Sequence, residues 1–117
     1  MTDGRPEATS PAAENDGIRV VDDPDEHRYE LWVDDELAGT IIYRSRDPVI
    51  RLVHTEVSTA FGGRGLGTRL IADALADIRA RGFRLVPQCR FVRAYLRKHP
   101  EDEDLVAPAH ANRHQRP

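Results

Sequence analysis

Alternating hydrophobic and polar residues predict three strands in the first half of the chain. The three segments are residues 27–33 (HRYELWV), 37–44 (LAGTIIYR) and 49–57 (VIRLVHTEV). In the first segment Tyr29, Leu31 and Val33 fall on one side, as in a half-buried strand, and the third segment is rich in β-branched residues, as strands are. Gly39 in the second segment indicates a bulge. Because the connections have hairpin length, we expect an antiparallel meander.

The second half of the chain changes to helical spacing. Apolar residues three and four apart predict a long helix that ends before Gly82, with a buried face made of Leu66, Leu70, Ile71, Ala74, Leu75 and Ile78. Residues 83–89 (FRLVPQC) are typical of a short strand ended by proline. Residues 90–99 (RFVRAYLRKH) predict a second helix with one apolar face, made of Phe91, Val92, Tyr95 and Leu96.

This order of elements predicts an α/β (α+β) fold. Three strands precede the long helix, and a fourth strand and the second helix follow it. The third strand, the long helix and the fourth strand form a β-α-β crossover, so the third and fourth strands are expected to be parallel neighbours. Residues 18–107 form the predicted domain, whereas residues 1–17 and 108–117 are polar, rich in proline and expected to be disordered tails.

Composition and charge narrow the possible functions. The 117 residues carry a formal net charge of -3, with 39% hydrophobic and 32% charged residues, which predicts one small domain without the basic character of a general polyanion binder. No apolar run approaches the roughly 20 residues of a membrane span, and the polar start lacks a signal-peptide core. A single cysteine excludes an internal disulfide and a cysteine-based zinc cage.

We therefore expect a cytoplasmic protein that binds neither a membrane nor a metal. His110 and His114 have a spacing that invites a metal site, but they lie in the polar C-terminal tail. A tail without a fixed backbone does not hold two imidazoles in a metal-binding geometry.

A glycine-rich stretch, AFGGRGLGTRL at residues 60–70, is the main candidate for chemistry. It lies between a strand and a helix N-terminus, where free backbone N–H groups and the helix dipole favour a phosphate or pyrophosphate. Its spacing fits neither the P-loop, which needs Lys and then Ser or Thr after its last glycine, nor the dinucleotide fingerprint. The structural alternative is a tight turn with a close contact between helix and sheet.

The spacing Gly62-x-x-Gly65-x-Gly67 resembles the acetyl-CoA loop of the GCN5-related N-acetyltransferases. Gly62 stands where that family usually has Gln or Arg. The ordered segments HTEV, GGRGLGTRL, VPQC and HPE with DLV resemble, more narrowly, a short single-domain acetyltransferase-like family that includes bacterial YjdJ-type proteins and their animal relatives. Two positions depart from it, Arg90 in place of a common Pro and Asp102 in place of a common aromatic residue.

The resemblance implies acyl transfer from acetyl-CoA, as co-substrate, to an amine of unknown identity. It implies that the loop binds the pyrophosphate, and the residues it assigns there are Gly62, Gly63, Arg64, Gly65, Leu66, Gly67 and Thr68. It further implies that Val57 and Ser58, at the end of the preceding strand, pair with the pantetheine arm as an added strand would.

Four residues are candidates for the catalytic groups. His54 and Glu56 are possible bases and alternate with Leu52, which predicts one shared face; otherwise the first is a buried structural histidine and the second an exposed carboxylate. Tyr95 is either the acid for the leaving thiolate or a core aromatic. Cys89 is a nucleophile, a contact of CoA or a packed core residue.

Two other readings of the function stay open at this stage. A non-catalytic CoA-binding module acting with a protein partner is the main alternative, because a polar segment precedes the first predicted strand and leaves the acceptor wall to a partner or a homo-oligomer. A basic stripe on the second helix allows a third reading, nucleic-acid binding, which we weigh lowest; its residues are Arg90, Arg93, Arg97 and Lys98.

Overall fold

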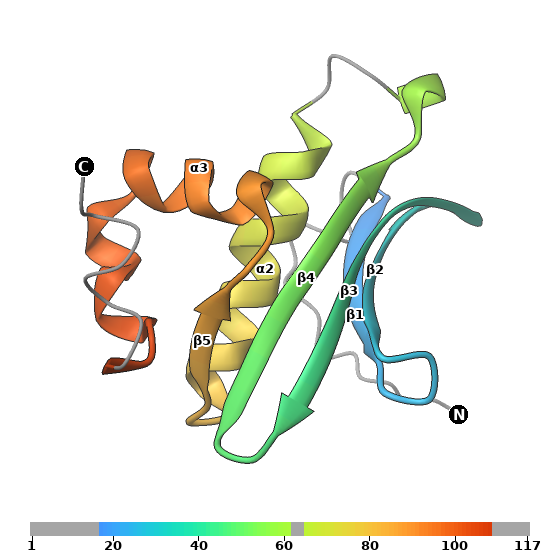
Figure 1. The fold of residues 1–117 in the computed structure, drawn as a ribbon. Helices are drawn as coiled ribbons and strands as arrows, with labels where there is room; N and C mark the ends of the chain where they lie inside the picture. The colour runs from blue at the N-terminus through green and yellow to red at the C-terminus, as the bar shows by residue number, and fades with distance from the viewer. Residues whose placement is uncertain (1–16, 62–64, 109–117) are drawn as a thin grey trace.

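The computed structural model describes residues 17–61 and 65–108 (Figure 1). The elements, in order, are β1 (Ile18–Asp23), β2 (Arg28–Val33), β3 (Glu36–Arg46), β4 (Val49–Val57), a 3₁₀ helix η1 (Thr59–Phe61), α2 (Leu66–Ala80), β5 (Arg84–Pro87), α3 (Arg90–Lys98) and a second 3₁₀ helix η2 (Pro100–Leu105). The predicted tails lie outside the described residues almost entirely, and so do Gly62, Gly63, Arg64, His110 and His114.

The five strands form one mixed sheet in the order β1-β2-β3-β4-β5. Strands β1 to β4 are antiparallel neighbours, and β5 lies parallel to β4 after the crossover through α2. The predicted meander, the crossover and the α/β class are therefore confirmed. The predicted bulge is also present, because Leu31 faces Gly39 while Trp32 faces Leu37, which leaves Ala38 as the extra residue.

The expectation that residues 27–33 form the first strand, with only a polar segment before it, is wrong, because β1 precedes it. Strand β1 pairs along its whole length with β2, from Ile18 opposite Val33 to Asp23 opposite Arg28. Only Ile18 of the six residues is buried, so β1 shows no strong alternation. Its place at the sheet edge explains this pattern, because an edge strand gains its order from the hydrogen bonds of one neighbour.

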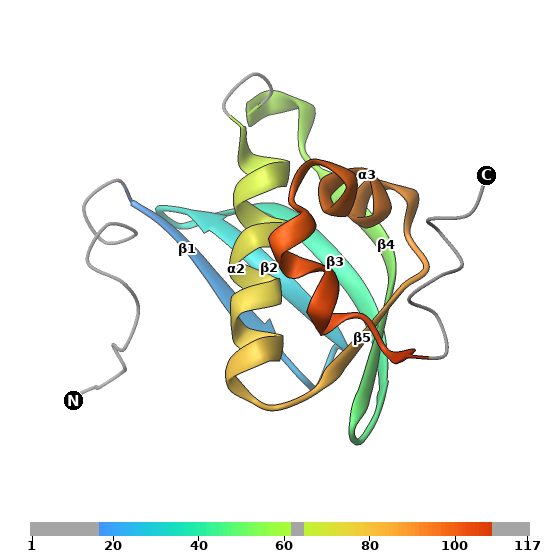
Figure 2. The ribbon, with the colours of Figure 1, turned by 90° about the vertical axis from the view of Figure 1, so that its left-hand side faces the viewer.

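Helix α2 covers one face of the sheet, with α3 beside its N-terminal half (Figure 2). All six residues predicted for its apolar face are buried. The prediction for α3 is only partly correct, since Val92 and Leu96 are buried but the Phe91 ring is 44% exposed. Of the described helices, none is both long enough and apolar enough to cross a membrane.

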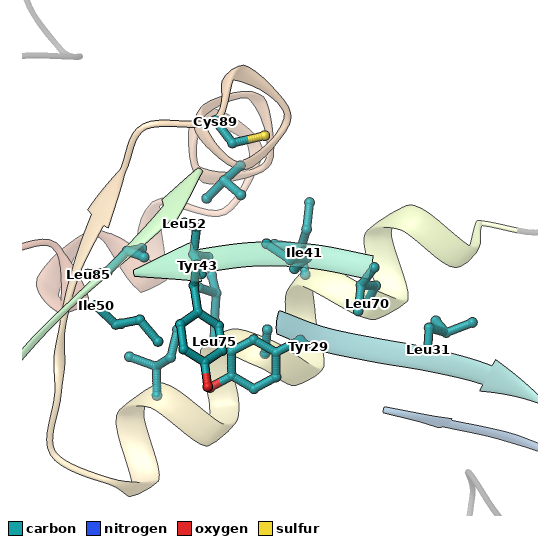
Figure 3. Packing of buried hydrophobic residues seen from close by; sticks show 14 of the residues in the cluster. Tyr29, Leu31, Ile41, Tyr43, Ile50, Leu52, Leu70, Leu75, Leu85 and Cys89 are labelled. Carbon is teal, nitrogen blue, oxygen red and sulfur yellow. The ribbon is translucent and has the colours of Figure 1, made fainter. Parts of the chain in front are cut away.

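The sheet end beneath the C-terminus of α2 is closed by a polar network, which we call the closed-end network. It consists of Asp22, Tyr29, Tyr43, Asp77 and Arg81. The two tyrosine rings lie 5.4 Å apart between centroids (Figure 3). Their hydroxyls donate to Asp77 at 2.7 Å and Asp22 at 2.6 Å, and Arg81 donates to both carboxylates. Burial, and then these carboxylates, raise the pKa of Tyr29 and of Tyr43.

Candidate active site

At the other end of the sheet, β4 and β5 separate. Their pairing runs from Val49 opposite Arg84 to Leu52 opposite Pro87. The N–H groups of Gln88 and Cys89 then both donate to the Leu52 carbonyl, at 3.1 and 2.9 Å, and the chain turns into α3. Strand β4 continues to Val57, and no described strand pairs with it on this side beyond Leu52. We call this opening the split.

A bulge in β4 decides which side chains face the split. Tyr43 of β3 faces Leu52, but Ile42 faces His54, so Val53 is an extra residue. A bulge shifts the alternation of side chains by one position. Leu52 is fully buried, whereas His54 and Glu56 lie on the opposite, exposed face. The prediction that these two residues share a face with Leu52 is therefore wrong, and simple alternation could not reveal the bulge.

The same strand leaves backbone groups open toward the split. Ser58 donates its N–H to the Ala38 carbonyl of β3 at 2.7 Å. Because backbone groups alternate in direction along an antiparallel strand, those of Val57 and Thr55 point away from β3, into the split. Of the two residues predicted to pair with pantetheine, Val57 has open backbone groups, while the N–H of Ser58 is already used.

Two adjoining hollows lie at the split. A cavity of about 540 Å³ is lined by His54, Thr55, Cys89, Arg90, Phe91, Arg93, Ala94 and Arg97. A second hollow of about 520 Å³ is lined by the ends of β3 and β4, including Glu56 and Val57. Thr55 lines both, so the two are neighbours. The volumes are in the range of small-molecule sites.

The two predicted bases interact with each other at these hollows. His54 Nε2 and Glu56 Oε2 are 3.3 Å apart, and their side chains are 59% and 75% exposed. The alternative of a buried structural histidine is therefore wrong. A carboxylate on one ring nitrogen fixes the orientation of an imidazole and leaves its other nitrogen, Nδ1, to accept a proton.

Cys89 lies at the start of α3 (Figure 3). It is one of the residues that line the larger cavity. The residue is 7% exposed, and its Sγ lies 3.3 Å from Thr55 Oγ1. The structure thus brings Cys89, Thr55 and His54 to one cavity. The side-chain group in contact with the sulfur is the neutral Thr55 hydroxyl, although Cys89 is also the N-cap of α3 and shares its cavity with Arg90, Arg93 and Arg97.

Tyr95 lies on the adjoining face of α3, toward α2. It lines a separate cavity of about 100 Å³ between α2 and α3, together with Thr68, Lys98 and His99. Its ring stacks on the His99 ring with centroids 4.0 Å apart. Burial, with smaller effects of Asp102 and Glu101, raises the pKa of Tyr95, so the phenol keeps its proton at neutral pH.

The N-terminus of α2 is open. Gly65 occupies its N-cap in the left-handed region, with φ of 70°, and no side chain caps the helix. The first helical hydrogen bond runs from Arg69 N–H to the Gly65 carbonyl at 3.1 Å, so the N–H groups of Leu66, Gly67 and Thr68 precede it. These N–H groups and the helix dipole suit a phosphate. Leu66 itself is buried and offers only its backbone.

The two described loop glycines serve different needs. A Cβ at Gly67 would lie 3.0 Å from the Phe91 ring, so this glycine allows α2 to approach α3 closely. A Cβ at Gly65 would meet nothing within 4 Å, so its requirement is conformational. Among the described residues, none occupies the position of a Cβ at Gly65.

The basic residues of α3 divide between two cavities. Arg90, Arg93 and Arg97 line the larger cavity beside β4, whereas Lys98 lines the small one beside α2. The prediction of a single basic stripe is therefore wrong for Lys98. Sequence analysis did not identify Thr55, whose hydroxyl contacts the Cys89 sulfur, as a site residue.

Within the described ranges, no three His, Cys, Asp or Glu side chains gather closely enough to bind a metal ion.

Comparisons with known proteins agree with this fold. A family model of the GCN5-related N-acetyltransferases matches residues 28–105, from the start of β2 to the end of η2. The NMR solution structure of a GCN5-like protein from Staphylococcus aureus has a similar fold, with a TM-score of 0.59; the two chains are 24% identical, and the match covers 78% of this chain and 89% of that one. No curated protein matches the chain. On the family match, the chain belongs to the GCN5-related N-acetyltransferases.

Proposed function

We propose that this protein transfers an acetyl group from acetyl-CoA to the nitrogen of an amine, with the split as its active site. The family uses acetyl-CoA as co-substrate, which supports the proposal. The observation that carries it is the open edge of β4 at Thr55 and Val57, close in sequence and space to the uncapped N-terminus of α2. A strand edge suits the amides of pantetheine, and a helix N-terminus suits a pyrophosphate.

The residues of the split divide the binding of acetyl-CoA between them. The N–H groups of Leu66, Gly67 and Thr68 hold the pyrophosphate, together with Gly62, Gly63 and Arg64, which lie outside the described residues. The backbone of Val57 and Thr55 pairs with the pantetheine arm. Cys89 and Thr55 then form the wall beside the thioester.

The reaction needs a base for the incoming amine and an acid for the leaving thiolate. The amine nitrogen attacks the thioester carbonyl carbon, so that a C–N bond forms and the C–S bond breaks. His54 Nδ1 takes the proton from the nitrogen, and Glu56 holds the ring through Nε2. Tyr95 gives its phenolic proton to the sulfur, and its raised pKa keeps that proton available at neutral pH.

Direct attack by the amine is favoured over an acetylated Cys89. No described side-chain base lies within hydrogen-bonding distance of its Sγ, whose partner is the Thr55 hydroxyl, and the thiol is largely buried. We therefore assign Cys89 to the cavity wall. In this role the Sγ of Cys89 contacts the sulfur or the acetyl group of acetyl-CoA, and such a contact does not require the thiol to be deprotonated.

A CoA-binding module without turnover is the second candidate. One observation favours it: His54 and Tyr95 line different cavities, one beside β4 and the other between α2 and α3. Phe91 and Ala94 line both cavities, so a shift of the exposed Phe91 ring would connect them. The two candidates differ only in turnover, which a single assay separates.

The test combines a binding and a transfer measurement. Calorimetric titration with acetyl-CoA is expected to show binding, and mass detection of products across an amine panel is expected to show acetylation. His54→Ala should lower turnover at least about 100-fold and leave the acetyl-CoA affinity unchanged. Binding without any acetylated product would favour the module, and absence of acetyl-CoA binding would contradict both candidates.

A further inference from the structure

The arginines of this protein differ in the partners of their guanidinium groups. Most of those on α2 and β2 contact carboxylates: Arg28 with Glu30, Arg69 with Asp73, Arg79 with Asp102 and Asp104, and Arg81 with Asp22 and Asp77. In the described part of the chain, Arg90, Arg93 and Arg97 have no carboxylate within ion-pair distance. The same holds for Arg19, Arg44, Arg46, Arg51 and Arg84. What distinguishes the three arginines of α3 is that they line one cavity at the split, whose described lining residues include no carboxylate.

Neighbouring residues add to this positive charge. Arg51 of β4 lies directly opposite Arg44 of β3, a pairing of like charges that costs stability in a sheet. Arg51 donates to the Gln88 side chain at 3.4 Å, and Arg93 donates to the Pro87 and Gln88 carbonyls. Gln88 thus joins the two arginines at the edge of the cavity. Neutral acceptors position them without cancelling their charge.

The local charge contrasts with that of the whole chain. The protein has a formal net charge of -3, yet Glu56 is the only carboxylate among the described residues that line either hollow, and it is paired with His54. A concave site lined by one sign of charge attracts ions of the opposite sign. A simple ammonium ion, the usual form of an amine at neutral pH, is repelled from such a site.

We propose that the acceptor is a small amine that also carries an anionic group, a carboxylate or a phosphate, bound by Arg90 and Arg97 at the rim of the cavity. The inference rests on the proposed acetyl transfer and names the class of its acceptor. The planar guanidinium binds carboxylates and phosphates through two parallel hydrogen bonds. Such an anion offsets the repulsion of the ammonium group and places its nitrogen toward His54. The cavity of about 540 Å³ fits a small molecule of this kind.

Matched acceptors test the proposal directly. β-Alanine is compared with its uncharged amide, and phosphoethanolamine with ethanolamine, so that the two arms separate a carboxylate from a phosphate. For at least one arm, kcat/KM is expected to be about tenfold or more higher for the anionic amine, the size of a charge-assisted hydrogen bond. Equal rates within both pairs would overturn the proposal.

Arginine variants assign the effect to the cavity. Arg90→Gln and Arg97→Gln should each raise KM for the anionic acceptor about tenfold and leave KM for the neutral acceptor and the affinity for acetyl-CoA unchanged. Arg46→Gln, an exposed arginine at the far hairpin, is the matched control and should change none of these values. A loss of acetyl-CoA affinity with an unchanged acceptor preference would assign the arginines to the phosphates of the co-substrate and overturn the proposal.

A binding probe keeps the test independent of turnover. N-acetyl-β-alanine and its amide are titrated into the wild-type protein and into the Arg90→Gln, Arg97→Gln double variant, with heteronuclear NMR as the readout. The charged probe should bind the wild type about tenfold more tightly than its amide, and the double variant should lose this difference. Equal binding, or binding of neither probe, would contradict the anionic acceptor even if acetyl-CoA binds as proposed. If acetyl-CoA does not bind, the proposed function fails, and the probe titration still decides whether the cavity recognises anions.

Discussion

The two ends of the sheet use polar groups in opposite ways. At the closed end, two buried tyrosine hydroxyls, two carboxylates and Arg81 satisfy one another and tie β1, β2, β3 and α2 together. At the split, the edge of β4 and the first N–H groups of α2 have no hydrogen-bond partners among the described residues, and three arginines of α3 have no carboxylate partner there. The difference indicates that one end supplies stability and the other binds ligands.

The comparison also explains how a small domain tolerates an open edge. Buried polar groups without partners are costly, so donors and acceptors left open must face water or a ligand. The core beneath both ends is continuous, running from Tyr29 and Tyr43 to Cys89. Changes at the split should therefore alter binding with little effect on stability, and changes at the closed end should do the reverse.

The largest expected effect is that of Gly65→Val on the binding of acetyl-CoA. A β-branched residue is strained at the φ of 70° that Gly65 adopts, and its side chain would fill the space next to the open N–H groups. We expect the affinity, measured by calorimetry, to fall at least about 100-fold, a loss near 2.7 kcal/mol.

Gly82→Val is the matched control for this variant. Gly82 lies at the other end of α2, with φ of 76° and nothing within 4 Å of an added Cβ. It should lose a similar amount of stability and keep its affinity for acetyl-CoA. If the two folded variants bind acetyl-CoA with equal affinity, the assignment of the pyrophosphate to the N-terminus of α2 is wrong.

Tyr95→Phe is expected to have the next largest effect, on turnover alone. If the phenol protonates the leaving thiolate, kcat should fall about 10- to 100-fold, at the low end of general-acid effects. The acetyl-CoA affinity and the melting temperature should change little, because the ring and its stacking on His99 remain. An unchanged kcat would reject the acid role.

The same substitution at the closed end should act on stability. Tyr29→Phe removes a hydroxyl that donates to Asp77 at 2.7 Å from a fully buried ring. We expect the free energy of unfolding, from urea denaturation, to fall by about 1.5 kcal/mol, typical of a hydrogen bond to a charged group. Acetyl-CoA affinity should be unchanged. A weaker acetyl-CoA affinity of Tyr29→Phe would show that the two ends of the sheet are coupled. It would contradict the division between a stabilising end and a binding end.

The closed-end network should also make the protein sensitive to alkali. The pKa of Tyr29 and Tyr43 is raised in the fold, mainly by burial, whereas a tyrosine in the unfolded chain loses its proton near pH 10. The stability from these groups is thus fully present below about pH 10 and is lost as pH rises further. Circular dichroism midpoints measured from pH 8 to 11.5 should fall above pH 10, and less so in Tyr29→Phe.

The smallest expected effect concerns Cys89. Acetyl-CoA bound in the split covers the cavity that this thiol lines, so a thiol reagent should modify the loaded protein several-fold more slowly than the free one. Cys89→Ala should keep most of the turnover, because the thiol is a wall of the cavity. Loss of turnover together with loss of an acetylated protein species would instead establish covalent catalysis.

Much of the fold could be predicted from the sequence, because it depends on local periodicity. The helix α2 shows its buried face in the spacing of its leucines, and β4 shows its β-branched residues. Strand β1 was missed because an edge strand with one buried residue has almost no local signal. The family was recognisable from ordered motifs, although neither periodicity nor composition alone pointed to it.

The site was less predictable, because it depends on a bulge and on contacts across the fold. The extra residue Val53 moves His54 and Glu56 to the face opposite Leu52. The composition of the strand does not indicate this bulge. The contact between Thr55 and Cys89 joins residues 34 positions apart. The carboxylate-free surroundings of the α3 arginines likewise follow from tertiary packing.

The most direct test is an NMR titration of ¹⁵N-labelled protein with acetyl-CoA. The account predicts that the amide signals of Thr55, Val57, Leu66, Gly67 and Thr68 shift strongly, since their N–H groups would contact the co-substrate. The amide signals of the closed-end network should not shift; its residues are Asp22, Tyr29, Tyr43, Asp77 and Arg81. Strong shifts at the closed end with unchanged signals along β4 and the first turn of α2 would contradict the assignment of the split as the binding site.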